Sequence, residues 1–383
     1  MTAVAGKKRI LGLSQDRGSV QAIVPVVAAL QGYPEVVVKL YSPAGCYPLL
    51  KSWDLAFDTL DMGGFATDPE GYLAKLFDEI EPQLLLSGSS PAKGAAPETP
   101  EQFAILEARR RRIPSVAVLD YWGMYLERFS SRGALIDDTL LPDRLCVLDR
   151  RCRDDLHQLG VPVESMAVTH NPWMDGVISQ ALDPPPSSDL LGNAGWRVLF
   201  VSQPLSGRLL SNQQAPQHEL LAELVRALPS AGGRRHRVLV WKHPAEEDDL
   251  WANITQFSTD DVEVFVSAER GASILAHVDM VATVHSTIAY EALHYGTPSL
   301  SLRCGVEHLP SSFIDELGLS KLIATVDELR SFLASAEPRA LRMQLLAQKR
   351  RFCEEGVFFS DGKATGRVMA EVLRLLAVSV GSR

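Results

Sequence analysis

Residues 280–303 read MVATVHSTIAYEALHYGTPSLSLR, and this stretch decides the fold. A short apolar run, Met280–Thr283, predicts a buried strand, and the residues after it begin a helix over Thr287–Tyr295. Gly296-Thr297-Pro298 ends that helix, and Ser299–Leu302 predicts the next strand. A strand, a helix and a second strand in this order form a βαβ unit of a parallel sheet.

The start of this helix is a candidate phosphate site. His285, Ser286 and Thr287 lie between the strand and the helix, and serine and threonine are favoured at helix N-termini. The first turn of a helix presents free N–H groups and the positive end of the helix dipole, which suit a phosphate or diphosphate. Glu291 follows one turn later, where its carboxylate could accept hydrogen bonds from the two hydroxyls of a ribose. The alternative is an ordinary capped helix with a surface glutamate.

Two further segments carry candidate residues, one at the end of an expected strand and one at a turn before the linker. In Val238–Glu247, VLVWKHPAEE, the proline after His243 ends the strand and leaves the imidazole at its carboxyl edge. There it can donate to a phosphate or exchange protons near pH 7. In Val168–Asp175, VTHNPWMD, the residues His170 and Asn171-Pro172 indicate a turn. A structural histidine and a simple hinge turn are the alternatives.

The whole chain repeats the alternation of strands and helices in two blocks. The expected strands are Lys8–Ser14, Val36–Tyr41, Leu84–Ser87, Ser115–Leu119 and Arg144–Leu148, then Arg197–Ser202, Arg237–Trp241, Val262–Val266, Met280–Thr283 and Ser299–Leu302. Between the blocks, Asp183-Pro184-Pro185-Pro186-Ser187-Ser188 cannot continue a helix or a central strand. We therefore predict two α/β domains, residues 1–180 and 196–383, joined by a linker over 181–195. Ligands of parallel sheets bind beyond the carboxyl ends of the strands, so the loops there carry the candidate residues.

The first domain offers two candidate bases. The segment Ser14–Ser19, SQDRGS, follows the first strand and precedes a helix. Asp16 could deprotonate a substrate hydroxyl, and we expect Arg17 and Gly18 to contact substrate, since glycine lets a substrate approach the backbone. Asp120 follows the fourth strand beside two aromatic residues, which are common sugar platforms and equally common core residues. Asp16 could instead cap the helix or pair with Arg17.

Three of these segments resemble UDP-N-acetylglucosamine 2-epimerases. The segment VTHNPWMD resembles their VTGNxxxD, Lys242-His243-Pro244 resembles their xxHP, and residues 285–298 resemble their SSGxxEExxxxGxP, which contacts nucleotide phosphates and ribose. Asp361-Gly362-Lys363-Ala364 is similar to the DGKAS tail of bacterial surface-polysaccharide enzymes, which suggests cell-surface polysaccharide biosynthesis. The resemblance covers roughly residue 168 to the end. It implies the GT-B fold: two Rossmann-like parallel-sheet domains facing across a cleft, with the C-terminal helix crossing back to the first domain.

The resemblance also implies that the second domain binds a nucleotide sugar. The diphosphate would lie on His285, Ser286 and Thr287 with His243 nearby, and the ribose would lie on Glu291. Further substrate contacts are expected at His170, Asn171, Ser202 and Gln203.

The departures from the family favour a transferase. Residues 202–207 read SQPLSG where the epimerases carry a basic GHRREN-like segment, and His285-Ser286-Thr287 is bulkier than the family's residues at the phosphate. We therefore predict a glycosyltransferase that moves a sugar from an NDP- or CMP-activated donor to a glycan, lipid or small-molecule acceptor. Asp16, Asp120 and His243 are its catalytic candidates. The alternatives are a 2-epimerase-like enzyme, hydrolysing or not, and a nucleotide-sugar-binding protein without catalysis.

Composition excludes several other classes. The 383 residues include 38 basic and 47 acidic ones, and the net charge of −9 argues against nucleic acid or an anionic membrane as the main partner. No apolar run approaches the ~20 residues of a membrane-spanning helix, and the first residues do not read as a signal peptide, so we expect a cytoplasmic protein. The five cysteines lack CxxC spacing and no acidic pair occupies a DxD position, so we expect no disulfide framework, metal or cofactor. A homodimer is compatible with these features.

Overall fold

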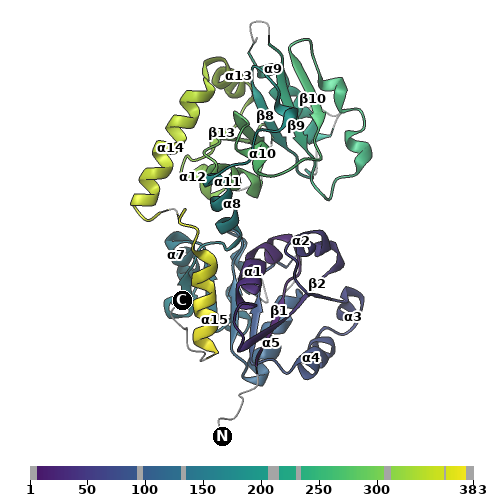
Figure 1. The fold of residues 1–383 in the computed structure, drawn as a ribbon, viewed down its shortest axis with the longest axis vertical. Helices are drawn as coiled ribbons and strands as arrows, with labels where there is room; N and C mark the ends of the chain where they lie inside the picture. The colour runs from purple at the N-terminus through teal and green to yellow at the C-terminus, as the bar shows by residue number, and fades with distance from the viewer. Residues whose placement is uncertain are drawn as a thin grey trace. The chain divides into compact units, whose positions relative to one another are not determined.

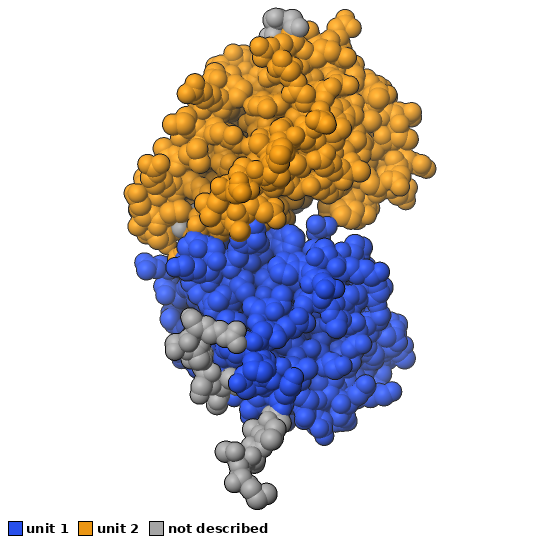
Figure 2. Space-filling model, viewed as in Figure 1, with its two compact units in different colours: residues 1–176, 361–383 blue, residues 177–360 orange. Residues whose placement is uncertain are grey.

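The computed structural model describes residues 7–92, 98–130, 135–205, 215–229, 234–305, 312–357 and 359–376. The chain forms two compact units, which Figures 1 and 2 show. Unit 1 contains Met1–Gly176 and Asp361–Arg383, and unit 2 contains Val177–Ser360. The chain therefore passes between the units twice, once within helix α8 (Trp173–Leu182) and once after Ser360.

The boundary differs from the predicted linker over 181–195 because the proline-rich segment is bonded to unit 2. Ser188 Oγ donates to Glu269 Oε2 at 2.6 Å, and the His277 ring nitrogen Nε2 lies 2.8 Å from the carbonyl oxygen of Pro185. Prolines break secondary structure, but they do not by themselves show which unit holds the broken segment.

Unit 1 is built on a seven-stranded sheet of order β3-β2-β1-β4-β5-β6-β7. Its strands are β1 (Lys8–Leu13), β2 (Val36–Ser42), β3 (Asp58–Thr59), β4 (Leu84–Ser87), β5 (Ser115–Val118), β6 (Arg144–Val147) and β7 (Met166–Val168). Its helices are α1 (Arg17–Leu30), α2 (Tyr47–Lys51), α3 (Met62–Thr67), α4 (Pro69–Ile80), α5 (Pro100–Arg111), α6 (Tyr125–Phe129), α7 (Arg150–Gln158) and α15 (Ala364–Leu375). All neighbouring strands are parallel, as predicted, so their carboxyl ends share one edge.

Unit 2 is built on a six-stranded sheet of order β10-β9-β8-β11-β12-β13, again with parallel neighbours. Its strands are β8 (Arg197–Val201), β9 (His236–Trp241), β10 (Val262–Val266), β11 (Met280–Thr283), β12 (Ser299–Leu302) and β13 (Lys321–Ile323). Its helices are α9 (Pro216–Ala227), α10 (Ala272–Leu275), α11 (Thr287–His294), α12 (Phe313–Glu316), α13 (Val326–Ser335) and α14 (Pro338–Glu354). The βαβ unit predicted from residues 280–303 is β11–α11–β12.

Each sheet has an apolar core on both faces, because successive strand residues point to opposite sides. In β1, Ile10 packs in a core with α1 and α15, whereas Leu11 packs in a core with α4 and α5. In β8, Val198 joins α9 and α13, whereas Leu199 joins α10 and α11. Strands buried on both faces read as continuous apolar runs, which is why they stand out in the sequence.

Helix α15 belongs to unit 1, as the resemblance implied. Three of its side chains are fully buried in the core that α1 shares: Val368, Val372 and Leu373. Asp175 accepts hydrogen bonds from the backbone N–H groups of Ala364 and Thr365, at 2.9 and 2.7 Å, and so caps the helix. Arg144 on β6 pairs with Glu371 on α15 at 2.9 Å.

Helix α14 is held to unit 2 by contacts with the ends of other helices. Arg342 donates to the carbonyl oxygens of Ala276 at 2.8 Å and Gly296 at 3.0 Å, and Lys349 donates to that of His294 at 3.1 Å. These carbonyls lie at the C-terminal ends of α10 and α11, where cations complement the helix dipole. Helix α11 is therefore fixed at the end opposite its candidate phosphate site.

Candidate functional site

The carboxyl edge of the unit 2 sheet brings the predicted phosphate residues together. Ser286 caps α11, since its Oγ accepts a hydrogen bond from the Ile288 N–H at 3.2 Å. Thr287 is exposed at the first position of the helix, and His285 is half-buried just before it. Strand β11 lies between β8 and β12, so this helix N-terminus opens in the interior of the sheet edge.

Gln203 and His285 connect the ends of two neighbouring strands. The side-chain amide of Gln203 donates to the backbone carbonyl of His285 and accepts from its backbone N–H. Gln203 was predicted to bind substrate, and in this structure its amide group fixes the backbone of His285. Burial, followed by the charge of Arg303, lowers the pKa of His285, so its imidazole is neutral near pH 7.

Arg303 is a buried cation that the sequence analysis did not single out. It follows β12 and is 8% exposed. Its Nε donates to Ser301 Oγ at 3.2 Å, and its Nη2 lies 3.5 Å from Asp315 Oδ2. An arginine after a strand carries no distinct sequence signal, because only the fold shows that it is buried beside His285. The carboxylate of Asp315, whose side chain is 1% exposed, balances this charge.

His243 lies in a tight turn after β9 that Glu246 closes. The backbone N–H of His243 donates to Glu246 Oε2 at 2.8 Å, and the backbone N–H of Glu246 donates to the His243 carbonyl at 3.0 Å. Ser202, at the end of β8, donates its hydroxyl to Glu246 Oε1 at 2.6 Å. The predicted residues His243 and Ser202 therefore meet through Glu246, which the sequence analysis had not identified.

Glu291 lies one turn into α11 and is partly buried. Burial and then the charge of Glu291 raise the pKa of Tyr295 to about 12. The role of Glu291 toward a ribose stays a prediction.

In unit 1, the two candidate bases converge above Gly18 at the start of α1. A Cβ added to Gly18 would lie 2.1 Å from Asp120 Oδ2 and 3.5 Å from Asp16 Oδ1. Asp16 is the N-cap of α1 and accepts from the Ser19 N–H at 2.9 Å, which is the capping role weighed as its alternative. Asp16 and Arg17 are both exposed. Glycine at position 18 is what allows the Asp120 carboxylate to lie against the helix.

Asp120 is held from two sides by buried groups. Arg128, whose side chain is 1% exposed, pairs with Asp120 Oδ1 at 2.7 Å and also donates to the backbone carbonyl of Ser89 after β4. The side-chain amide of Asn171 donates to the Asp120 carbonyl at 2.9 Å. A buried guanidinium requires a counter-charge, and Asp120 supplies it.

Glu101 is a third carboxyl group near this edge, and the sequence analysis missed it. It is fully buried and accepts hydrogen bonds from Ser19 Oγ, from the Gln15 N–H at 3.1 Å, and from the N–H and Oγ of Ser90 at 3.2 and 3.1 Å. Burial and then the charge of Asp16 raise the pKa of Glu101 to about 7. In the sequence it reads as an ordinary acidic residue in the first turn of α5.

His170 and Asn171, both predicted to contact substrate, are buried at the end of β7. His170 has φ = +70°, the left-handed region that favours glycine, and the resembling epimerase segment has glycine at this position. Burial lowers the pKa of His170 to about 4, with opposing effects from the charges of Asp361 and Arg367. His170 therefore lies close enough to the returning C-terminal segment to feel its charges, whereas Asn171 is bonded to Asp120.

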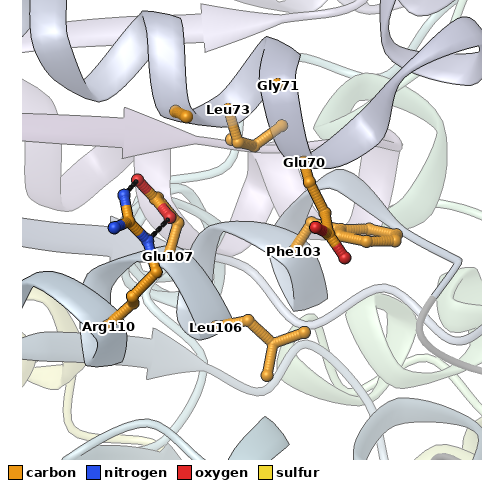
Figure 3. A pocket seen from close by; sticks show the side chains of 8 residues that line it. Glu70, Gly71, Leu73, Phe103, Leu106, Glu107 and Arg110 are labelled. Atoms are coloured by element: carbon orange, nitrogen blue, oxygen red, sulfur yellow. Dashed lines mark hydrogen bonds and ion pairs between the residues drawn. The ribbon is translucent and has the colours of Figure 1, made fainter.

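Described residues of unit 1 line surface hollows, one of which Figure 3 shows. The hollow of about 370 Å³ lies between α4 and α5 and ends at the ion pair of Glu107 with Arg110. The hollow of about 460 Å³ is lined by Met62, Phe65 and Phe103 and reaches Gln15 beside Asp16. None of the predicted site residues lines either hollow.

Two other features are absent from the residues that the structure describes. Among those residues, no group of three or more His, Cys, Asp or Glu side chains is placed to hold a metal ion. In the same part of the chain, no helix combines the length and apolar character needed to cross a membrane.

Comparison with solved structures identifies the fold. The chain is similar to a UDP-N-acetylglucosamine 2-epimerase at 17% identity and a TM-score of 0.66, covering 99% of this chain and 98% of that one. It is similar to S. aureus MnaA in complex with UDP at 15% identity and a TM-score of 0.69, covering 98% and 99%. It is also similar to the glycotransferase of kitacinnamycin at 17% identity and a TM-score of 0.62, covering 97% and 99%. No protein-family model and no curated protein sequence matches the chain. The protein has the GT-B fold, with two Rossmann-like parallel-sheet units.

Proposed function

We propose that this protein is a nucleotide-sugar enzyme that binds the diphosphate of its substrate at the carboxyl edge of the unit 2 sheet. The observation that carries the proposal is the arrangement of His243, His285 and the capped start of α11 along this one edge. The N–H groups of the helix start and the helix dipole favour a bound diphosphate.

Among nucleotide-sugar reactions, we favour 2-epimerase-like chemistry on a UDP-sugar, which was the alternative in the sequence analysis. Solved structures with the same fold are described as UDP-N-acetylglucosamine 2-epimerases, and two of them hold UDP-GlcNAc. Glycosyl transfer stays as the second candidate. One similar structure is described as a glycotransferase, and residues 202–207 lack the basic segment of the epimerases.

Both reactions share a step in which the bond between the anomeric carbon and the nucleotide phosphate breaks. Charge then develops on the departing diphosphate, and preorganised donors there lower the barrier. In unit 2, the donors are the first N–H groups of α11 and the imidazole of His243. In unit 1, Asp16 and Asp120 are the candidates for accepting a proton, from the sugar in an epimerase or from the acceptor hydroxyl in a transferase.

Binding tests the site without assuming a reaction. UDP should raise the thermal midpoint more than CMP, CDP, GDP or dTDP, because a ligand that binds only the folded state stabilises it. Ser286→Ala and Glu291→Ala should each weaken UDP binding by ~1–3 kcal/mol, the range for a lost hydrogen bond to a charged group. Thr325→Ala, which removes the equivalent cap of α13 beside the outermost strand β13, is the matched control. Unchanged UDP affinity in both site variants would show that the nucleotide does not bind at the start of α11.

Product analysis separates the two reactions. With UDP-GlcNAc and no acceptor, an epimerase forms the 2-epimer or releases UDP and a free sugar at the rate of turnover. A transferase shows at most slow hydrolysis until an acceptor is added. Tight UDP binding with no product under either condition would leave the third alternative, a binding protein without catalysis.

A further inference from the structure

The turn after β9 is closed by one buried carboxylate. Glu246 is 7% exposed and lies three residues after His243, with Pro244 between them. Its backbone N–H donates to the His243 carbonyl at 3.0 Å, as in a β-turn with proline at the second position. Its side chain returns to accept from the His243 backbone N–H at 2.8 Å.

The same carboxylate accepts hydrogen bonds from side chains in three other parts of unit 2. Oε1 accepts from Ser202 Oγ at 2.6 Å and from Gln217 Nε2 of α9 at 3.2 Å, and Oε2 also accepts from Trp251 Nε1 at 3.2 Å. All four side-chain contacts of Glu246 are with donors. A glutamine at this position would place an NH₂ group against some of them, so the network requires a carboxylate.

This closed turn determines how the His243 ring is presented. The backbone N–H of Ala245 donates to His243 Nδ1 at 3.1 Å. A nitrogen that accepts a hydrogen bond carries no proton, so in the neutral ring the proton is on Nε2. His243 therefore presents an N–H group through Nε2, which is what a phosphate oxygen accepts.

We propose that Glu246 is a positioning residue that sets His243 as an Nε2–H donor to the nucleotide phosphate. The proposal rests on the proposed function for the identity of the ligand. Glu246 acts on the turn backbone, the turn directs the Ala245 N–H to Nδ1, and the ring then keeps one tautomer and one orientation. The matching chemistry of the ligand is an oxyanion of a nucleoside diphosphate.

The experiment compares Glu246→Gln with Glu247→Gln, which makes the same chemical change at the next, exposed position. Glu246→Asp serves as a second variant that keeps the charge and withdraws the carboxylate by one methylene. For each variant, ¹⁵N NMR of the His243 ring reports the tautomer above pH 8, with His243→Ala used for assignment, and calorimetry measures UDP affinity.

We expect the wild type and Glu247→Gln to show an unprotonated Nδ1 and a protonated Nε2, with UDP affinities within twofold of each other. Glu246→Gln and Glu246→Asp should shift both ring nitrogens toward the average of two tautomers and lower UDP affinity at least fivefold. In a His243→Ala background, Glu246→Gln should change affinity less than twofold, because the residue acts through the ring.

Two results would overturn the proposal. One is an unchanged His243 tautomer in both Glu246 variants, and the other is a loss of affinity from Glu246→Gln that is as large without the His243 ring as with it. If the wild-type protein does not bind UDP, the proposed function is wrong. The NMR spectra of the His243 ring would then be the only test of whether Glu246 positions that ring.

Discussion

Replacing Glu101 by glutamine should remove the loss of stability that this one group causes between pH 5 and pH 7.5. Glu101 has a pKa of about 7 in the folded protein and about 4.5 as an ordinary side chain. The folded state therefore holds the proton more tightly than the unfolded state. This contribution to stability is complete below the unfolded pKa and is lost as the pH rises through the folded pKa.

The two pKa values set the size of the effect. Their difference corresponds to about 3 kcal/mol at ~1.36 kcal/mol per tenfold change in proton affinity. Between pH 5 and pH 7.5 the linkage relation gives a loss of about 2 kcal/mol from this group. Glutamine cannot ionise, so the variant should lack that loss and keep the pH dependence of all other groups.

Urea unfolding measures the free energy of unfolding of the wild type and of Glu101→Gln at both pH values. The change with pH in the variant is then subtracted from the change in the wild type, and the contribution of unit 2, which is the same in both proteins, drops out. Asp16→Asn is an informative control, because its charge is the second cause of the raised pKa and asparagine still caps a helix. It should reduce the pH dependence without abolishing it. Equal changes with pH in the wild type and Glu101→Gln would refute the reasoning.

Three further substitutions test the geometry of unit 1. His170→Gly should be more stable than His170→Ala by about 1 kcal/mol, because both lose the ring and only glycine relieves the positive φ; equal urea midpoints would contradict this. Gly88→Ala should lower the free energy of unfolding by more than ~2 kcal/mol, because its Cβ would lie 1.9 Å from Ser19 Oγ and 2.8 Å from the Cα of the same residue; a wild-type melting temperature would show that the backbone can yield. Arg128→Met should lower the free energy of unfolding by about 3 kcal/mol, because it leaves the Asp120 carboxylate without its partner. Adding Asp120→Asn to this variant should recover part of that loss. If the losses of the two single variants simply add in the double variant, the two residues are not coupled.

The central strands were predictable from the sequence, because strands buried on both faces are continuous apolar runs, and their alternation with helices indicated parallel sheets. Strands β3, β7 and β13 were not predicted. They are two or three residues long and lie at sheet edges, where too few side chains carry a pattern. Helix α14 was missed for a different reason. It buries few apolar side chains, among them Leu345 and Phe352, and polar contacts with other helix ends hold it in place.

The candidate site was predictable in position and only partly in its residues. The rule that ligands lie beyond strand ends located Asp16, Asp120, His243 and Ser286 correctly at the carboxyl edges of their sheets. The buried groups that hold such residues, among them Arg128 and Glu246, look like surface residues in the sequence. Their partners are brought to them by other strands, so no local pattern could reveal them.

The return of the chain to unit 1 has a consequence for the order of folding during synthesis. Residues 177–360 are synthesised as one uninterrupted stretch. All strands and helices of unit 2 are therefore present before α15 has been translated. Unit 1 must wait, because Val368, Val372 and Leu373 fill its core and the Asp175 carboxylate caps the helix that carries them. On the ribosome, the second unit to begin translation is therefore the first that can finish folding, and unit 1 keeps an open apolar face beside α1 until α15 arrives.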